Sequence, residues 1–286
     1  MESILPQQPA NYGQVISRSL TLYRVAFAKI VFFALLMALI VFIPRLLSDI
    51  IGQDIFANID PLSPHRLWFL AIEIGSLIFF IAILWHMNCV VRGKKEPLVQ
   101  DVMTGTKKAL SVFIASMLQC AIIFAFSFLV YGVLLLLNHL QLLFINSLAG
   151  VILTTVIFAG QLLLLLYVST LFIFQVPLIA LENKGILSAI ENSVLLVWNH
   201  WWRVFSVQAT PWIAYLCTLI VFKYILQIDI HIYFTNKSHN EIATTVLNMA
   251  LFTLFIPWVA AILLSQLKDL ELRKQLVPKS KTRKHK

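Results

Sequence analysis

Six long apolar stretches, separated by short polar and charged segments, dominate the pattern of the chain. Each is long enough to cross the roughly 30 Å hydrocarbon core of a bilayer as an α-helix. They cover residues 26–47, 67–88, 109–137, 148–181, 204–226 and 242–267. The pattern therefore predicts an all-α fold, a polytopic transmembrane helical bundle with six spans.

The third and fourth stretches belong to one run, between Lys108 and Glu182, that contains no Asp, Glu, Lys or Arg. As a single helix this run would measure about 110 Å, so it must cross a membrane more than once. Tilt, or helical extensions beyond the headgroups, would accommodate the excess length of these two spans. Composition agrees, because a chain that is 60% hydrophobic and 12% charged does not resemble a soluble domain.

The distribution of Lys and Arg predicts the orientation of the spans, since these residues stay on the cytoplasmic side. Of the 22 Lys and Arg residues, all but four fall in segments on one side of the six-span map. The four exceptions are Arg45, Arg66, Lys223 and Lys237. We therefore expect both termini in the cytoplasm. The basic tail, 268–286, is expected to lie against anionic lipids, and topology explains it without nucleic-acid binding.

A segment with an amphipathic helical pattern precedes the first and the last pair of spans. Residues 15–28 and 186–202 both place apolar side chains at three-to-four spacing, with polar side chains between them. Such helices fit in the plane of the headgroup boundary. An indole suits that depth, so we expect three tryptophans to act as interfacial anchors. They are Trp198, Trp201 and Trp202.

The two segments also align with each other, whereas the middle one, 98–110, aligns poorly. We predict three repeats of an in-plane helix plus a transmembrane hairpin within one transmembrane domain, 1–267. The repeats cover 14–88, 97–181 and 184–267. The alternative is that any helix entering a membrane from a basic loop shows this pattern.

The sequence from 174 to 214 carries a resemblance to a known family. It ends a span with a proline and an acidic residue, continues with Gly-Ile and a serine-containing amphipathic helix, and reaches a Trp before the next span. The residues are Pro177, Glu182, Gly185, Ile186, Ser193 and Trp198. This pattern resembles the YciC-like family of uncharacterised bacterial inner-membrane proteins, and the membrane domain of some glycerophosphodiester phosphodiesterases. The resemblance implies a six-helix protein of the bacterial cytoplasmic (inner) membrane with a role in envelope maintenance, and it implies no catalysis.

Ionisable and amide side chains within the spans are the candidates for a polar site, because a charge inside a bilayer is costly. Glu73, in the second span, could bind a cation, carry a proton or pair with Lys223. Gln161 and Asn248 could line a route with it, or could form interhelical hydrogen bonds. His86, near the inner end of the same span, is expected to be an interfacial histidine.

No metal or cofactor site is predicted. Cys89, Cys120 and Cys217 have the spacing of neither a disulfide framework nor a zinc site, and we interpret them as small membrane-buried side chains. The outer loop with Asp229, His231, His239 and Glu241 matches no ligand pattern.

The sequence also lacks a Ser/His/Asp or Cys/His arrangement, a phosphate-binding glycine loop and paired carboxylates of an active site. We therefore expect no enzyme. The favoured function is a non-enzymatic structural or envelope-maintenance role in the lipid bilayer. The alternative is a small-molecule or lipid transporter with a polar route between the repeats.

Overall fold

The computed structural model describes residues 5–51, 65–139, 148–227 and 241–276. All regular secondary structure among these residues is helical. The helices are α1 (Tyr12–Ile51), α2 (His65–Val91), α3 (Leu98–His139), α4 (Leu148–Leu171), α5 (Gln175–Glu182), α6 (Ile186–Val197), α7 (Trp201–Ile220) and α8 (Glu241–Leu276). A 3-10 turn, Trp198–His200, joins α6 to α7, and a π-helical turn, Val221–Ile225, follows α7.

The predicted all-α fold with six membrane-spanning helices is confirmed. Six helical stretches are long and apolar enough to cross a bilayer, and each contains or closely overlaps one predicted span. They are Tyr12–Leu47, Phe69–Val91, Leu98–Leu136, Gly150–Glu182, Ile186–Ile225 and Ile242–Gln275. The chain is therefore an integral membrane protein by the length and composition of its helices.

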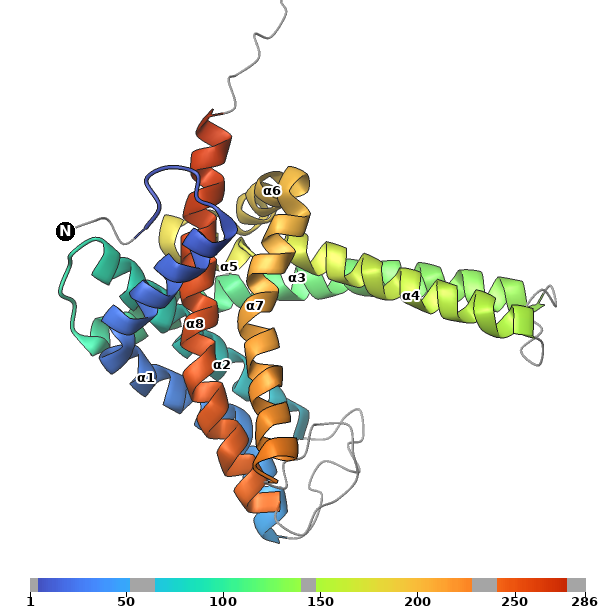
Figure 1. Cartoon of the computed structure of the whole chain (residues 1–286), viewed down its shortest axis with the longest axis horizontal. Coiled ribbons are helices and arrows are strands. Elements are labelled where there is room, and N and C mark those ends of the chain that lie inside the picture. The colour runs from blue at the N-terminus through green and yellow to red at the C-terminus, as the bar shows by residue number, and fades with distance from the viewer. Residues whose placement is uncertain (1–4, 52–64, 140–147, 228–240, 277–286) are drawn as a thin grey trace, which may run out of the picture.

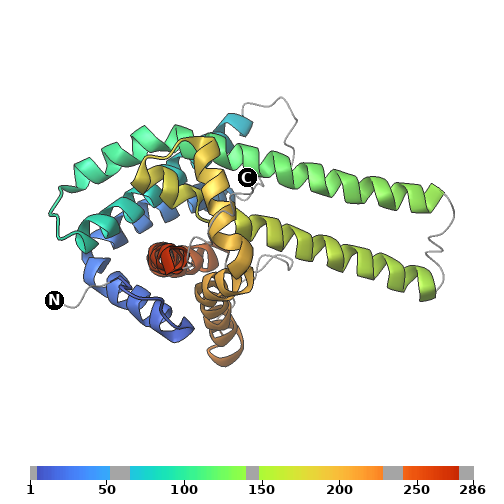
Figure 2. The ribbon, with the colours of Figure 1, turned by 90° about the horizontal axis from the view of Figure 1, so that it is seen from above.

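Helix α8 forms the centre of the body of the molecule. Figures 1 and 2 show it between α1 and α7, with α2 behind it. Small residues line its contact with α1, since Ala26 and Ala34 belong to the same buried cluster as Ala260 and Ala261. In a membrane, where lipid solvates apolar side chains as well as protein does, small residues favour helix association by letting backbones approach closely.

Helices α3 and α4 form a hairpin that extends to one side of this body, across the direction of α7 and α8 (Figures 1 and 2). Its apolar side chains point outward; Phe124 and Phe128 are 74% and 77% exposed. The base of the hairpin is joined to the body by a hydrogen bond from the Gln175 amide to Gln119. The rest of the hairpin needs lipid or another apolar surface around it.

The close approach of α3 to α2 depends on Gly105. A Cβ atom at this position would lie 2.4 Å from the backbone oxygen of Ile78. No side chain fits between the two helices there, so the crossing of α2 and α3 requires glycine.

Several segments lie together at one end of the body. They are segments that the distribution of Lys and Arg assigns to the same side of the membrane. A cavity of about 250 Å³ is lined by the N-terminal Leu5, by Arg92 of the α2–α3 loop, by Glu182 at the end of α5 and by Lys268 of α8. The N-terminal segment and the C-terminal part of α8 therefore meet. We call this end of the molecule the polar end.

The three predicted entry segments differ from one another in the structure. Residues 15–28 are continuous with the first span in α1, which bends in its first half (Figures 1 and 2). Residues 98–110 are the first turns of α3, without a break. Only the third forms a helix of its own, α6, which the 3-10 turn separates from α7. The threefold repeat stays a prediction.

The predicted span 148–181 is divided into two helices. Helix α4 ends at Leu171 and α5 begins at Gln175, with Pro177 in its first turn. A proline is tolerated in a first turn but lacks the N–H that would continue an earlier helix. Pro177 therefore lies at the start of α5, the short helix with which this span ends at Glu182.

Candidate functional site at the polar end

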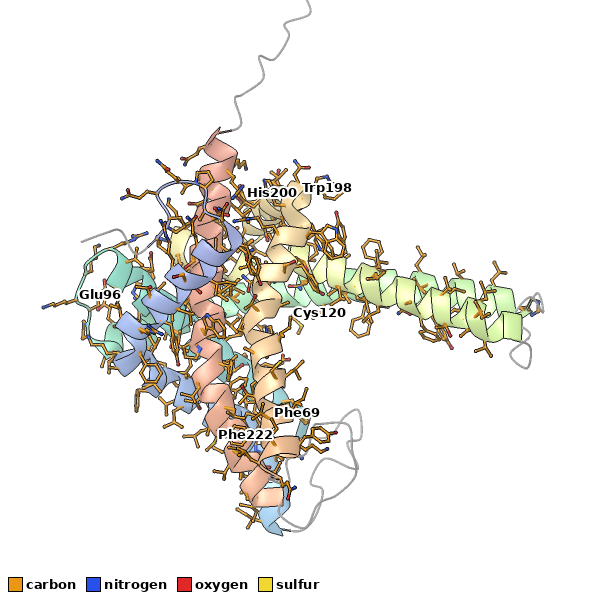
Figure 3. The ribbon with its side chains drawn as sticks, viewed as in Figure 1. Phe69, Glu96, Cys120, Trp198, His200 and Phe222 are labelled. Carbon is orange, nitrogen blue, oxygen red and sulfur yellow. The ribbon has the colours of Figure 1, made fainter. Side chains whose placement is uncertain are left out.

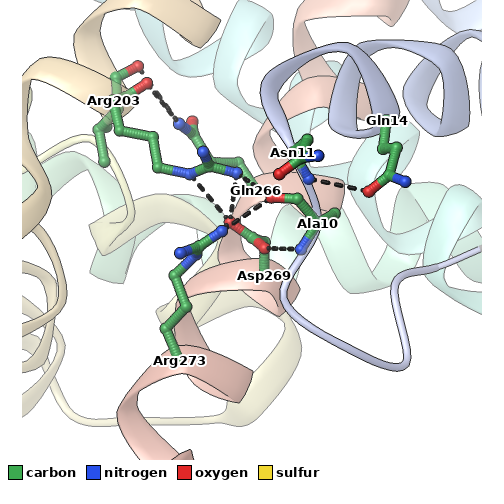
Figure 4. A network of polar contacts seen from close by, with 8 residues as sticks. Ala10, Asn11, Gln14, Arg203, Gln266, Asp269 and Arg273 are labelled. Carbon is green, nitrogen blue, oxygen red and sulfur yellow. Dashed lines mark hydrogen bonds and ion pairs between the residues drawn. The ribbon is translucent and has the colours of Figure 1, made fainter. Parts of the chain in front are cut away.

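Asp269, in the C-terminal half of α8, is the centre of a buried hydrogen-bond network (Figure 4). Its side chain is fully buried. One carboxylate oxygen accepts a hydrogen bond from the Ala10 N–H at 2.7 Å. The other accepts from Arg203 Nε and Nη2 at 3.1 and 3.0 Å, and from Arg273 Nε at 3.0 Å. Asp269 thus joins the N-terminal segment, α7 and α8.

Both arginines also hold the other side of the Ala10 peptide. Arg203 and Arg273 each donate through Nη2 to the Ala10 carbonyl oxygen. The N–H and the C=O of one residue are therefore fixed by three charged side chains. Charge-assisted hydrogen bonds of this kind are roughly twice as strong as neutral ones.

A glutamine pair continues the network into the body. The Gln208 amide donates to Gln266 Oε1 at 2.7 Å. The Gln266 amide in turn donates to the backbone oxygens of Arg203 and Val204, both at 3.3 Å. These contacts lock α7 against α8 next to the Asp269 network. Because both side chains are buried and paired, they serve as interhelical hydrogen bonds.

A second charged cluster lies on the 250 Å³ cavity. Lys184 pairs with Glu182 at 2.9 Å, and Lys268 pairs with Glu271 at 3.2 Å. The two carboxylates also contact each other. Each acid has its own lysine, and the contact between the two acids ties the end of α5 to α8.

A third cluster surrounds the turn between α2 and α3. His86 and Asp101 are both buried, and His86 Nδ1 lies 2.7 Å from Asp101 Oδ2. The Trp85 indole donates to Glu96 Oε2 at 2.9 Å. Cys89, Glu96 and Asp101 bring one sulfur and two carboxylate oxygens within 4.8 Å of one another. His86 is thus near the end of its span, as expected, but it is buried and paired rather than exposed at an interface.

The residues predicted to form an intramembrane polar site do not meet. Glu73 is exposed on α2, and its backbone oxygen accepts a hydrogen bond from Ser76. Gln161 lies near the middle of α4, in the extended hairpin, whereas Asn248 is buried in α8. Among the described residues, no hydrogen bond or ion pair joins any two of them.

The ion pairs of the described residues do not include Glu73 with Lys223, which was one of the three possibilities for Glu73. Lys223 lies in the π-helical turn after α7, with its ammonium 5.7 Å from the centre of the Tyr224 ring. The outer-loop residues Asp229, His231 and His239 lie outside the described residues, as does the tail after Leu276.

The predicted anchor tryptophans divide into two kinds. Trp198 and Trp202 are 59% and 69% exposed, as a residue facing headgroups would be. Trp201 instead packs inward; it stacks on Phe205 and donates to the Tyr167 backbone oxygen. Figure 3 shows Trp198 and His200 toward one end of the molecule, with Phe69 and Phe222 toward the other.

Sequence reasoning missed the Asp269 network because it counted Arg203 and Asp269 only as charges beside the membrane. A signal was present in the helical spacing. Ser265, Asp269 and Arg273 repeat every four residues in α8, which places a polar stripe on one face of the helix.

Comparison with protein-family models, curated proteins and solved structures finds no match.

Proposed function

We propose that this chain is a non-enzymatic structural protein of a bacterial cytoplasmic membrane, with a role in envelope maintenance, as its resemblance to the YciC-like family implies. One observation carries the proposal. The buried carboxylate of Asp269 and the part-buried Arg203 and Arg273 bind one another and the Ala10 backbone, joining segments far apart in sequence. Groups used in this way stabilise a compact body and are not available to a substrate.

We further propose that the polar end faces the cytoplasm, so that both termini lie inside. The gathering of Arg92, Lys184, Arg203 and Lys268 at this end supports the orientation, because basic segments resist translocation. The tail from 268 to 286 would then lie beside the inner leaflet, where each basic side chain gains about 1 kcal/mol from anionic lipid.

Reporter fusions test this topology. A reporter after Asn138, near the tip of the α3–α4 hairpin, is expected to be outside the cytoplasm, and a reporter after Lys286 inside it. Paired fusions to alkaline phosphatase and to green fluorescent protein measure both sides. The same compartment for both positions would contradict the six-crossing map. In particular, it would mean that the hairpin does not cross the membrane.

The transporter is the second candidate, and the buried Asn248 favours it. Its Oδ1 atom is buried without a hydrogen-bond partner among the described residues. The scatter of Glu73, Gln161 and Asn248 over α2, α4 and α8 argues against one route through all three.

Proton flux in proteoliposomes tests transport through Glu73, since this is the acid within a span that the sequence offers as a proton carrier. With an entrapped pH-sensitive dye and an imposed pH gradient, the structural role predicts the same flux as in protein-free vesicles. It also predicts no change on Glu73→Gln or on the control Glu191→Gln, an exposed carboxylate on α6. A flux above the background that Glu73→Gln removes, and Glu191→Gln preserves, would favour transport.

A further inference from the structure

Three side chains with metal-binding atoms converge at the turn between α2 and α3. They are the thiol of Cys89, near the end of α2, the carboxylate of Glu96, in the loop, and the carboxylate of Asp101, in the first turn of α3. One ligand atom from each lies within 4.8 Å of the other two. Cys89 and Asp101 are 2% and 0% exposed, and Glu96 is partly exposed.

The local sequence makes this convergence possible. Helix α2 ends with a left-handed residue, Gly93 at φ 68°, and the Lys94 N–H donates to the Cys89 oxygen at 2.9 Å. This is a Schellman closure, for which glycine is the usual residue. It reverses the chain directly after Cys89, so that the loop carries Glu96 back toward the thiol. Figure 3 shows Glu96 at this turn.

The carboxylate of Asp101 provides independent evidence for a ligand. Its Oδ2 atom contacts His86 Nδ1, but its Oδ1 atom is buried and has no hydrogen-bond partner among the described residues. An unpaired buried acceptor of this kind costs free energy, and native proteins rarely leave one unexplained. A cation bound between Asp101, Glu96 and Cys89 would provide the missing partner.

We propose that Cys89, Glu96 and Asp101 bind a divalent transition metal of the zinc class. A thiolate with two carboxylates suits such an ion, whereas Mg²⁺ and Ca²⁺ prefer oxygen ligands alone. In a tetrahedral zinc site the ligand atoms are about 3.5 Å apart, given metal-ligand bonds of roughly 2.0 to 2.3 Å. The three atoms of this cluster lie within 4.8 Å of one another, so they must move somewhat closer together when an ion binds.

The neighbouring groups match the surroundings of a metal site. His86 holds one oxygen of Asp101, and Trp85 holds one oxygen of Glu96. These hydrogen bonds orient the two carboxylates, and metal ligands in proteins are commonly oriented in this way. Three anionic ligands and a divalent cation carry a net charge of −1, which the exposed Arg92 and Lys94 beside the site offset.

A metal here fastens the end of α2 to the start of α3. Three protein ligands leave one position for water. The Cys89 thiol must release its proton to solvent when the metal–sulfur bond forms, so binding weakens as the pH falls.

Cobalt binding to the full-length protein, purified in detergent without a polyhistidine tag, tests the proposal. Co²⁺ is expected to bind one equivalent per chain and to produce a near-ultraviolet thiolate-to-cobalt absorption band that Zn²⁺ abolishes by competition. Cys89→Ser removes the band. The matched variant Cys217→Ser, which changes an exposed cysteine on α7, leaves it unchanged.

A second variant, Glu96→Gln, tests the site with a substitution that is expected to leave the fold intact. A glutamine oxygen still accepts the Trp85 hydrogen bond, and position 96 is partly exposed, so the variant keeps the fold. We expect at least about tenfold weaker Co²⁺ binding, by analogy with other losses at metal sites. Binding without the thiolate band, or equal affinity in wild type, Cys89→Ser and Glu96→Gln, would show that only adventitious surface binding occurs and would overturn the proposal.

Discussion

Asp269→Asn is expected to reduce the amount of folded protein sharply. The substitution keeps the size of the side chain but removes its charge, so two arginines lose their counter-ion. An asparagine also turns an N–H₂ group toward donors, where Asp269 presented only acceptors. Removing one partner of a buried ion pair costs about 3 to 5 kcal/mol, a large part of the stability of a typical domain.

The loss should spread to the N-terminal segment, because Asp269 binds the Ala10 N–H directly. Released from Asp269, the segment keeps the hydrogen bonds to the Ala10 carbonyl and the apolar packing of Leu5 and Ala10. Limited proteolysis should therefore cut before Tyr12 faster in the variant than in the wild type.

Fluorescence-detected size-exclusion chromatography with a heating step measures the effect, as the temperature at which half of the monodisperse peak is lost. Glu191→Gln provides the control, since Glu191 is an exposed carboxylate on α6 and its neutralisation should change the midpoint little. Equal midpoints for the two variants would show that the Asp269 network does not stabilise the fold.

The positions of the membrane-spanning helices could be predicted from the sequence because lipid imposes a length and a composition on each span. The residues at which the helices begin and end outside the lipid could not be predicted from the sequence. Residues 15–28 continue into the first span because no proline interrupts the chain before Pro44, so the helix has no local reason to stop. The division of 148–181 did have a local signal, because Pro177 stands in the first turn of α5.

The polar contacts depended on tertiary structure that hydropathy does not report. A search for charges within the spans selects Glu73 because of its position along the second span. That position does not show which face of α2 carries the side chain. In the structure Glu73 lies on an exposed face. Asp269 was discounted because it lies beyond the predicted span, although its partner Arg203 is 66 residues away and its partner Ala10 gives no sequence signal at all. Only folding brings these groups together.

Gly105→Ala is expected to separate α2 from α3. The added methyl group would lie 2.4 Å from the Ile78 backbone oxygen, far inside the distance at which two atoms touch. A backbone atom cannot rotate away as a side chain can, so one helix must move as a body. Gly132→Ala is a matched control on the same helix, because a Cβ atom there has nothing within 4 Å. Since alanine favours helix by up to about 1 kcal/mol over glycine, the control should be neutral or slightly stabilising.

The same thermal measurement should give a clear fall in the midpoint for Gly105→Ala and none for Gly132→Ala. Gly105 lies one helical turn after Asp101, so a shift of α3 should also carry Asp101 away from Cys89 and His86. If the proposed metal site is correct, Gly105→Ala therefore weakens Co²⁺ binding at Cys89, whereas Gly132→Ala preserves it. Unchanged stability in Gly105→Ala would mean that α2 and α3 do not cross at Ile78, and the geometry that brings Cys89, Glu96 and Asp101 together would lose its support.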